Sequence, residues 1–527
     1  MDVLSALGGR RVTKAEVAVF VSGVASMGLE ILAGRIVAPQ FGSSIYTWGG
    51  IITVFLAALS LGYWRGGRRA STHADHRRLI WLLLFTAVYV AILIYARDLL
   101  LIATAQIPLP SRYASLPAIV VLFGPPTYLL GFISPYAAEL SHKEGVGEAS
   151  GHVYALGTIG SILGAGATTF VLIPSMSIES IGLFFGLLLV GTALVLSAPA
   201  FPRRPVVATV VVTVLLVVAA SGGAVGLDPR GEVVYSTQTA YQQLEVVDDG
   251  DVRTMYLDGA HHSARDLEDP ERHVFAYTRY FHLPMLMVEE PERALFVGGG
   301  GFTGPQDFER TYDDVTVDVV EIDPEVTAAA EEYFGLERSA ELRVHTDDGR
   351  TFLAESDREY DVIVLDAYKR DQVPFELTTV EFMTLVSERL SDDGVLVANV
   401  ISAPEGPASE FYRAQYRTME EAFPHVYAYR TSESGSVQNI QLVATNDPDG
   451  VSTTELHERN GAREDVPELG EEIDDRIEEV RTDDVPTLYD DRAPVDSLLD
   501  PMVGQRYVIE DGEGTDATAG ALEPATP

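Results

Sequence analysis

The segment from Ala294 to Ser402 constrains the fold of this chain more than any other part of the sequence. Four short apolar runs follow one another there, and each is followed by glycines or ends in an acidic residue. They read ALFVGGGG, VDVVE, ELRVHTDDG and YDVIVLD. Such runs at this spacing are typical of βαβ units in a parallel sheet. Ligands of parallel sheets bind at the carboxyl ends of the strands, which is where these glycines and acids are expected.

The chain of 527 residues divides sharply by charge. Residues 1–226 hold 14 Lys and Arg against 9 Asp and Glu, whereas the remainder holds 23 basic and 68 acidic residues. The acidic part would repel phosphates, so no nucleic acid partner is expected. Lys occurs only at positions 14, 143 and 369, which together with the acid excess favours a salt-loving, haloarchaeal source. Arginine-biased codons in a GC-rich genome are the alternative explanation for the scarcity of lysine.

Cysteine is absent from the sequence. Disulfides, thiolate metal sites and a cysteine nucleophile are therefore excluded. The pair His261-His262 follows a turn, but it has no convincing partner at metal-ligand spacing. No metal site is expected, and a surface or substrate-lining role is favoured for this pair.

Apolar segments near or above the ~20 residues that span a bilayer fill the first part of the chain. Seven can be drawn, at residues 15–38, 47–64, 79–105, 116–138, 152–173, 178–199 and 205–226. They predict a polytopic membrane domain in contact with the lipid bilayer of the cell membrane. In the fifth segment Gly157, Gly160, Gly164 and Gly166 are expected to permit close contact between helices.

A glycine run and a later acid together predict a nucleoside site. Gly298 and Gly300 follow the strand ALFV, where glycines let the backbone approach a ligand and open a helix. Glu321 ends the next strand, a position where an acid typically accepts hydrogen bonds from ribose hydroxyls. Asp348 and Gly349 follow the third strand and would reach the adenine. A solvated acid at a strand end is the alternative for Glu321, but the preceding glycine run favours ribose binding.

Asp366 ends the fourth strand, YDVIVLD, after a run of apolar residues. Its carboxylate is therefore expected at the ligand edge of the sheet, where it could act as a base or orient a cationic amine. A helix N-cap is the alternative role for an Asp in this position.

The side of the membrane on which the acidic part lies is constrained by basic residues. Basic residues precede the first apolar segment and follow the second and the sixth, at Lys14, at 65–78 and at 203–204. Seven spans then place the acidic part outside, whereas adenosylated cofactors are made inside. We expect it inside, with the fourth segment re-entrant at Gly124-Pro125-Pro126 or the third divided at Arg97-Asp98.

The predicted fold is a multi-pass α-helical membrane domain followed by an α/β Rossmann-like, class I methyltransferase-like domain with a small β subdomain at its start. Asp249-Gly250 is a hairpin signal within that β subdomain. The predicted boundaries are 1–226 for the membrane domain, 227–288 for the β subdomain, 289–450 for the Rossmann-like domain, 451–510 for an acidic segment and 511–527 for a disordered tail.

Taken in order, these residues resemble the spermidine synthase (polyamine aminopropyltransferase) family over roughly residues 230–400. The shared residues are Tyr241-Gln242, Leu257-Asp258-Gly259, Gly298–Gly301, Val320-Glu321-Ile322-Asp323, Asp347-Asp348-Gly349, Tyr360-Asp361 with Asp366, and Pro374 followed by Leu377-Thr378. The whole chain resembles polytopic membrane proteins that carry such a domain, through SMGLEILAGRIVAPQFGSS, YALGTIGSILGAG and DDRAPVDSLL.

This resemblance implies aminopropyl transfer from decarboxylated S-adenosylmethionine to an amine such as putrescine, with release of methylthioadenosine. Asp366 matches the proton acceptor of the family. The resemblance also assigns nucleoside contacts, which are Gln242, Glu321, Asp348, Gly349 and Pro374.

Three departures from the family concern the amine. Gly301 stands where the family has an acid, Ala276-Tyr277-Thr278 replaces its Tyr-His-Glu, and Lys369 replaces a second acid. A lysine would repel a dication, so putrescine specificity is not expected to be the ordinary one. The candidate substrate-binding residues are Tyr241, Tyr277 and Asp371. Asp371 is included because it could substitute for a missing acid.

Two other functions fit the same pattern. A methyltransferase that uses S-adenosylmethionine shares the glycine run and the ribose acid, and the missing acid at Gly301 favours it. A membrane transporter or sensor could bind a nucleoside or polyamine without turnover. A homodimer is a further expectation.

Overall fold

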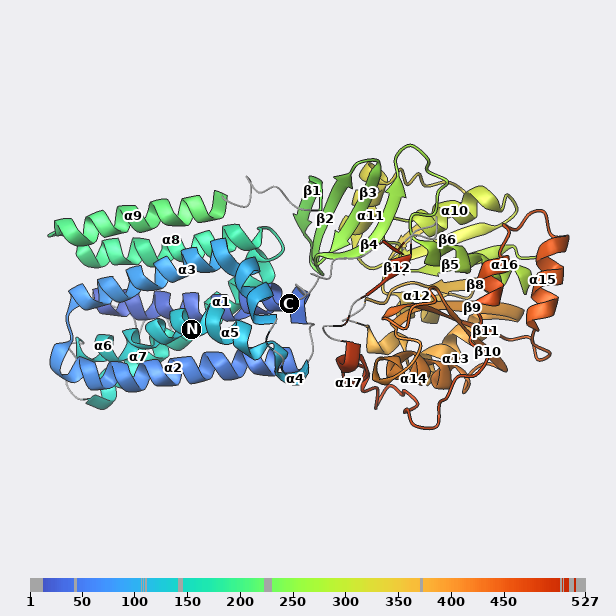
Figure 1. The fold of residues 1–527 in the computed structure, drawn as a ribbon. Coiled ribbons are helices and arrows are strands. Elements are labelled where there is room, and N and C mark those ends of the chain that lie inside the picture. Colours follow the sequence, from blue (N-terminus) through green and yellow to red (C-terminus); the bar gives the residue numbers. More distant parts are fainter. Residues whose placement is uncertain are drawn as a thin grey trace, which may run out of the picture. The chain divides into compact units, whose positions relative to one another are not determined.

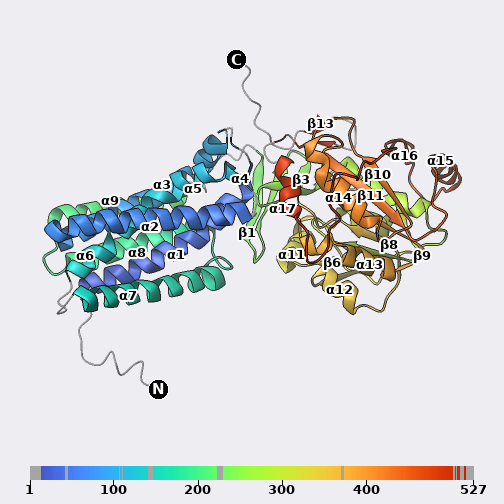
Figure 2. The ribbon, with the colours of Figure 1, turned by 90° about the horizontal axis from the view of Figure 1, so that it is seen from below.

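The computed structural model describes residues 13–41, 45–105, 107, 109, 111–140, 146–221, 230–369, 373–502, 505, 507–510 and 516–517. The chain forms two compact units, Met1–Leu227 and Asp228–Pro527 (Figure 1, Figure 2). The candidate Asp371 lies outside the described residues. Of the tail predicted as disordered, Asp516–Ala517 is described and forms the short strand β13, which pairs with β12.

In the first unit the described residues fold into helices. Their bounds are α1 Lys14–Phe41, α2 Ile45–His73, α3 His76–Ala105, α4 Ser111–Ala114, α5 Leu116–Gly131, α6 Ile133–Glu139, α7 Val146–Ala167 with the π-helical turn η1 Thr168–Leu172, α8 Ile178–Ser197 and α9 Arg203–Ser221. Seven helical stretches among the described residues are long and apolar enough to cross a membrane, in the places predicted from the sequence.

Neither of the interruptions expected in these segments ends a helix at the expected place. Helix α3 continues through Arg97, whose guanidinium pairs with Glu179 of α8 at 2.5 Å. Helix α5 continues through Pro125 and Pro126 and ends only at Gly131, directly before α6. Prolines of this kind are tolerated in apolar helices when the surrounding structure satisfies the freed carbonyl groups.

Glycines bring α1 and α7 together, as the sequence predicted for three of the four residues. A Cβ on Gly160 would overlap the carbonyl oxygen of Phe20, and one on Gly164 would overlap that of Val24. A Cβ on Gly23 of α1 would overlap the carbonyl oxygen of Gly157, whereas a Cβ on Gly157 itself would make an ordinary contact with Val19 at 3.5 Å. Gly166 was expected at this contact but is not part of it, because a Cβ there would meet nothing within 4 Å.

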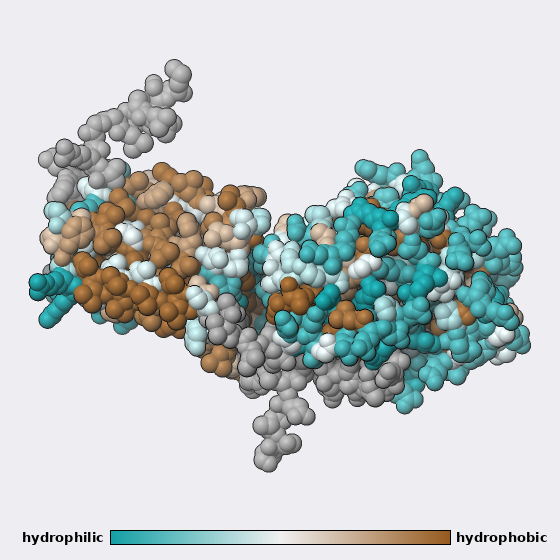
Figure 3. Space-filling view, turned by 90° about the horizontal axis from the view of Figure 1, so that it is seen from above, coloured by the Kyte–Doolittle hydropathy of each residue, from teal (hydrophilic) through white to brown (hydrophobic). Residues whose placement is uncertain are grey.

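The surface of the first unit is largely hydrophobic on the face shown in Figure 3, whereas that of the second is mainly hydrophilic. Helix α7 and η1 expose large apolar side chains, among them Tyr154 (76%), Ile162 (65%) and Phe170 (79%). Large contiguous apolar patches are uncommon on soluble monomers, so these exposed side chains are suited to a lipid environment.

The second unit begins with a four-stranded antiparallel sheet in the order β1-β2-β3-β4. Its strands are β1 Glu232–Gln238, β2 Gln243–Asp249, β3 Val252–Leu257 and β4 Ala260–Asp266. The hairpin predicted at Asp249-Gly250 joins β2 to β3, and Gly250 has φ +59°.

A seven-stranded sheet follows, in the order β10-β11-β9-β8-β5-β6-β7. Its strands are β5 Arg293–Val297, β6 Thr316–Glu321, β7 Leu342–Thr346, β8 Tyr360–Leu365, β9 Leu390–Ser402, β10 His425–Arg430 and β11 Gln438–Thr445. The strands from β5 to β9 pair in parallel, and β11 lies antiparallel between β9 and β10. The chain order reverses between β5 and β8, which is the Rossmann-like, methyltransferase-like fold that the sequence predicted.

Alternate residues of β5 enter two separate cores, one on each face of the sheet. Ala294 and Phe296 pack with η3 Ala276–Leu286, α10 Thr303–Thr311 and α11 Pro324–Tyr333. Leu295 and Val297 pack with α12 Gly349–Glu355, α13 Val380–Arg389 and α14 Glu410–Met419. Because both faces are covered, the strands are mainly apolar, and Asp318, Asn399 and Gln441 are buried polar exceptions inside β6, β9 and β11.

The acidic segment predicted for residues 451–510 is part of this fold. Its elements are α15 Thr453–Ala462, α16 Gly470–Asp474, α17 Val495–Leu499, the turn η6 Asp500–Met502 and β12 Ile509–Glu510. Leu456 and Ile473 enter the first core, and Leu488 and Leu498 enter the second.

Candidate active site

The carboxyl ends of three neighbouring strands bring the predicted catalytic and nucleoside residues to one edge. The backbone N–H of Gly298 donates to Val320 at 2.9 Å, and that of Asp366 donates to Val297 at 3.0 Å. These bonds extend the ladders of β6, β5 and β8 by one residue. Gly298, Glu321 and Asp366 therefore lie side by side, as predicted.

Two of the glycines are required by the backbone and by close approach. Gly298 has φ +99°, and a Cβ there would lie 2.5 Å from the carbonyl oxygen of Asp366. Gly300 has φ +52°, and a Cβ there would lie 2.7 Å from the hydroxyl of Ser263 and 2.9 Å from the His262 ring. Any other residue would strain the loop and push the neighbouring strands apart.

Glu321 is buried and holds this glycine loop. Its carboxylate accepts hydrogen bonds from the backbone N–H groups of Gly299 at 2.9 Å, Gly300 at 3.4 Å and Asp323 at 2.9 Å. Burial raises the pKa of Glu321, and the three donated bonds oppose that rise. A carboxylate has about four acceptor positions, so Glu321 can fix the loop and still accept from ribose hydroxyls.

Asp366 lies just past the end of β8, in a segment without regular structure, and does not cap a helix. The side-chain amide of Asn399 on β9 donates to its Oδ1 at 2.8 Å. Burial raises the pKa of Asp366 to about 6, and the bond from Asn399 opposes the rise. Burial raises the pKa of the Tyr277 phenol, and the negative charge of Asp366 adds to that rise. A base with a pKa of this value is well matched to proton transfer near neutral pH.

Lys369 lies three residues after Asp366 and faces the small β-sheet. Its ammonium donates to Oε1 of the buried Gln242 and lies 3.6 Å from the Asp258 carboxylate. Burial and the charge of Lys369 lower the pKa of His262 to about 4. The Lys369 ammonium is thus held beside Gln242, a residue that the sequence analysis assigned to nucleoside binding.

Gly301 has no room for a side chain. A Cβ there would lie 2.8 Å from Cβ of Ser263 and 3.0 Å from the ring of Phe334. The Ser263 hydroxyl accepts a hydrogen bond from the Gly301 N–H at 2.9 Å. The loss of an acid at this position is therefore built into the packing of β4 against the glycine loop.

The other predicted residues are positioned as follows. Asp348 caps α12 by accepting from the Thr351 N–H at 2.8 Å, and a Cβ on Gly349 would lie 2.5 Å from a methyl group of Val297. Pro374 directly precedes the turn η4 Phe375–Leu377. Tyr241 lies in the turn before β2 with half of its surface exposed.

Sequence reasoning missed two residues of this edge, Asn399 and Ser263, and it missed the hydrogen bond from Lys369 to Gln242. Asn399 had a detectable signal, because it is a polar residue inside the apolar run VLVANVIS. Ser263 had none, since its role arises only when β4 packs against the glycine loop.

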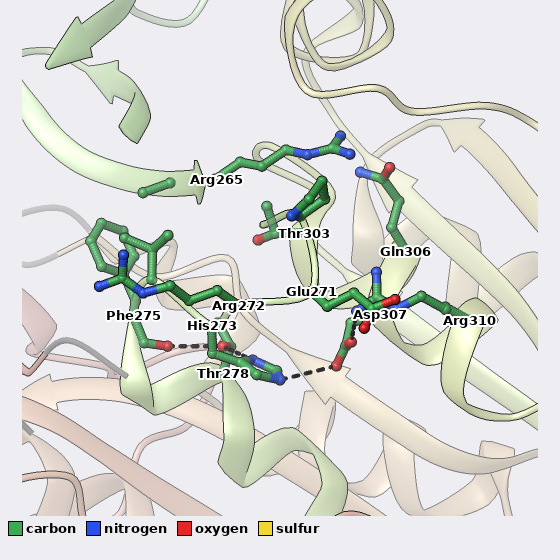
Figure 4. A pocket seen from close by; sticks show the side chains of 13 residues that line it. Arg265, Glu271, Arg272, His273, Phe275, Thr278, Thr303, Gln306, Asp307 and Arg310 are labelled. Atoms are coloured by element: carbon green, nitrogen blue, oxygen red, sulfur yellow. Dashed lines mark hydrogen bonds and ion pairs between the residues drawn. The ribbon is translucent and has the colours of Figure 1, made fainter. Parts of the chain in front are cut away.

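A cavity lies between β4, η3 and α10 (Figure 4). His273, His282 and Asp307 come close enough there to suggest a metal site. Each is already partnered, however, because Asp307 pairs with Arg310 and with His282 at 2.8 Å, and Thr278 lies 2.8 Å from His273. We interpret this trio as a largely buried hydrogen-bonded network around the ion pair of Asp307 with Arg310.

Comparison with known proteins places the matched region in the second unit. Residues 274–432 match the spermine/spermidine synthase domain family. The polyamine aminopropyltransferase of Vibrio vulnificus is 30% identical over 224 residues, which are 41% of this chain and 73% of the relative. A probable polyamine aminopropyl transferase of Bifidobacterium longum is 31% identical over 241 residues, which are 43% of this chain and 53% of the relative. The solved spermidine synthase of Thermotoga maritima aligns with 52% of this chain and 88% of its own, at 20% identity and a TM-score of 0.35.

Proposed function

The chain belongs to the polyamine aminopropyltransferase (spermidine synthase) family, and on this premise we propose that Asp366 is the base of an aminopropyl transfer in its second unit. The substrates are decarboxylated S-adenosylmethionine and an amine, and the product nucleoside is methylthioadenosine. The position and raised pKa of Asp366 carry this assignment.

The reaction is a displacement at the carbon beside the sulfonium. The amine nitrogen forms the new C–N bond while the C–S bond breaks. The electron pair of the C–S bond leaves with the sulfur of methylthioadenosine. Asp366 takes the proton that the nitrogen loses, so the product amine does not carry an extra proton out of the site. Glu321 and the loop from Gly298 to Gly300 hold the ribose, and Gln242, Asp348, Gly349 and Pro374 hold the rest of the nucleoside.

Incubation of the purified full-length protein with each of two donors tests this function directly. With decarboxylated S-adenosylmethionine and a panel of amines, methylthioadenosine should accumulate together with an aminopropylated amine. With S-adenosylmethionine, S-adenosylhomocysteine would instead indicate a methyltransferase. Binding of the donors without either product would indicate a sensor or transporter.

Lys369 bears on the choice of amine. A fixed cation in this position disfavours acceptors with a second positive charge, since two unit charges at short range repel strongly in a partly buried site. We expect Lys369→Asp to increase kcat/KM for putrescine by about tenfold or more relative to a monoamine. Lys369→Met removes the charge without adding an acid, and its effect should be smaller. Equal putrescine preference in all three proteins would remove Lys369 from acceptor selection.

The first unit is proposed to anchor the enzyme in the cell membrane, with the second unit on the cytoplasmic side where the donor is made. One of the seven candidate helices then does not cross. The fourth stretch, Arg112–Glu139, is the best choice, because it is divided into α4, α5 and α6 and carries Pro125 and Pro126 inside α5.

The strongly acidic second part of the chain is proposed to suit a high-salt cytoplasm. Mutual repulsion of its carboxylates is screened by salt, so the thermal stability of the protein should rise between about 0.1 M and 1 M KCl.

A further inference from the structure

Three buried amide side chains form a continuous hydrogen-bonded network that ends on Asp366. Asn399 donates from Nδ2 to Oδ1 of Asp366 at 2.8 Å. Its own Oδ1 accepts from Nδ2 of Asn439 and from Nε2 of Gln441, both at 2.8 Å. The hydroxyl of Tyr507 donates to Oδ1 of Asn439 at 2.8 Å. Each of the three amides is at most 3% exposed.

The network fixes which way the Asn399 amide points. An amide flipped by 180° would place its N–H₂ group against two other N–H donors and its oxygen against a carboxylate. Both contacts would be repulsive, whereas the observed orientation pairs the amide nitrogen of Asn399 with an acceptor and its oxygen with two donors. Gln441 lies directly opposite Asn399 in the pairing of β11 with β9, and Asn439 lies on the same face two residues earlier. The antiparallel strand β11 thus supplies the donors that orient Asn399.

We propose that Asn439 and Gln441 are positioning residues for the reaction, which act through Asn399 to hold one oxygen of Asp366 and leave the other for the attacking amine. This inference rests on the proposed function, because it assigns a task to residues that support the proposed base. Among the described residues, the side chains of Asn439 and Gln441 make their hydrogen bonds to Asn399 and Tyr507 and none to Asp366.

The electrostatic consequence is specific. Burial favours the protonated form of Asp366, whereas a donated hydrogen bond favours the carboxylate. The neighbouring Tyr277 is buried with a raised pKa and stays neutral, and no cation pairs with Asp366 among the described residues. Loss of the Asn399 bond should therefore raise the pH above which the base is ionised.

Two variants of the full-length, detergent-solubilised protein test this. Asn399→Asp keeps the shape and the two accepted bonds but turns an acceptor toward Asp366. The double variant Asn439→Leu/Gln441→Leu leaves Asn399 and Asp366 in place and removes the two orienting donors, together with the acceptor of the Tyr507 hydroxyl. Thr445→Val is the matched control, because Thr445 is buried on the same strand outside the network. The readouts are kcat and kcat/KM for aminopropyl transfer between pH 5 and 9, methylthioadenosine affinity and the melting temperature.

We expect the acidic limb of the kcat profile to move up by about one pH unit in Asn399→Asp and by a smaller amount in the double variant. Methylthioadenosine affinity should change less than about threefold, and Thr445→Val should leave the limb in place. An unmoved limb in folded, active forms of both variants would overturn the proposal while leaving the function intact. An inactive wild-type protein with every amine would instead overturn the proposed function.

Discussion

Two carboxylates, those of Glu321 and Asp366, are buried at the ligand edge, and burying a charged group is energetically unfavourable. Both carboxylates have raised pKa values because of burial, and both are compensated only by neutral donors. Functional sites commonly contain groups that lower the stability of the folded protein. For Asp366 the loss of stability can be measured through its pH dependence, since the pKa rises from an ordinary 3.8 to about 6.

Asp366→Asn should lower turnover by about 10²–10⁴-fold while methylthioadenosine binding changes much less.

The Asp366→Asn variant should also be more stable than the wild type. Because the folded-state pKa is raised, the free energy of unfolding of the wild type falls as pH increases through about 6. The variant should therefore gain up to roughly 3 kcal/mol at neutral pH, and the gain should vanish below about pH 4. Thermal unfolding at several pH values and steady-state kinetics measure the two effects, and near-full turnover in the variant would exclude Asp366 as the base.

Glu321→Ala should weaken methylthioadenosine binding about tenfold or more, because ribose hydroxyls and the N–H groups of Gly299 and Gly300 lose their acceptor. Glu321→Gln keeps one acceptor oxygen and should show a smaller loss. Titration calorimetry measures the affinity, and circular dichroism shows whether the variants remain folded. Unchanged affinity in the folded Ala variant would remove Glu321 from the nucleoside site.

At the scale of elements, the contact of α1 with α7 depends on glycines that allow the two backbones to touch. Gly160→Ala places a methyl group against the carbonyl of Phe20, so α7 must move away from α1. We expect a loss of about 1–3 kcal/mol, as for overpacked cores. Gly166→Ala is the control, since its Cβ meets nothing, and it should be neutral or stabilising by up to about 1 kcal/mol.

The melting temperatures of the two alanine variants in the same detergent provide the measurement. A similar loss in both would mean that the glycines act through helix flexibility rather than through packing.

A glycine in the active-site loop, Gly301, is also required by packing, because a side chain there would meet Ser263 and Phe334. An acid cannot simply be restored at that position.

At the scale of the whole molecule, the orientation in the membrane is open to a direct test. Digestion of intact cells with an added protease should leave residues 230–500 uncut until the cells are lysed, if the second unit is cytoplasmic. Cleavage in this range without lysis would place the unit outside and would mean that all seven candidate helices cross. A cytoplasmic marker protein in the same cells controls for leakage.

The sequence by itself determined the two-part organisation, the seven apolar helices, the parallel sheet and the edge that carries Gly298, Glu321 and Asp366. These follow from local signals, because hydropathy, residue spacing and strand ends are all written in contiguous segments. The continuity of α3 and α5 was not readable, since the ion pair of Arg97 with Glu179 joins residues far apart in the chain.

Only the tertiary structure decided what surrounds the catalytic carboxylate. The amides that orient Asn399 come from β11, some forty residues later, and reach it only because that strand inserts antiparallel beside β9. The lack of space at Gly301 likewise depends on Ser263 of a different sheet. Contacts between distant segments set the pKa and the shape of the site, and no local pattern in the sequence encodes them.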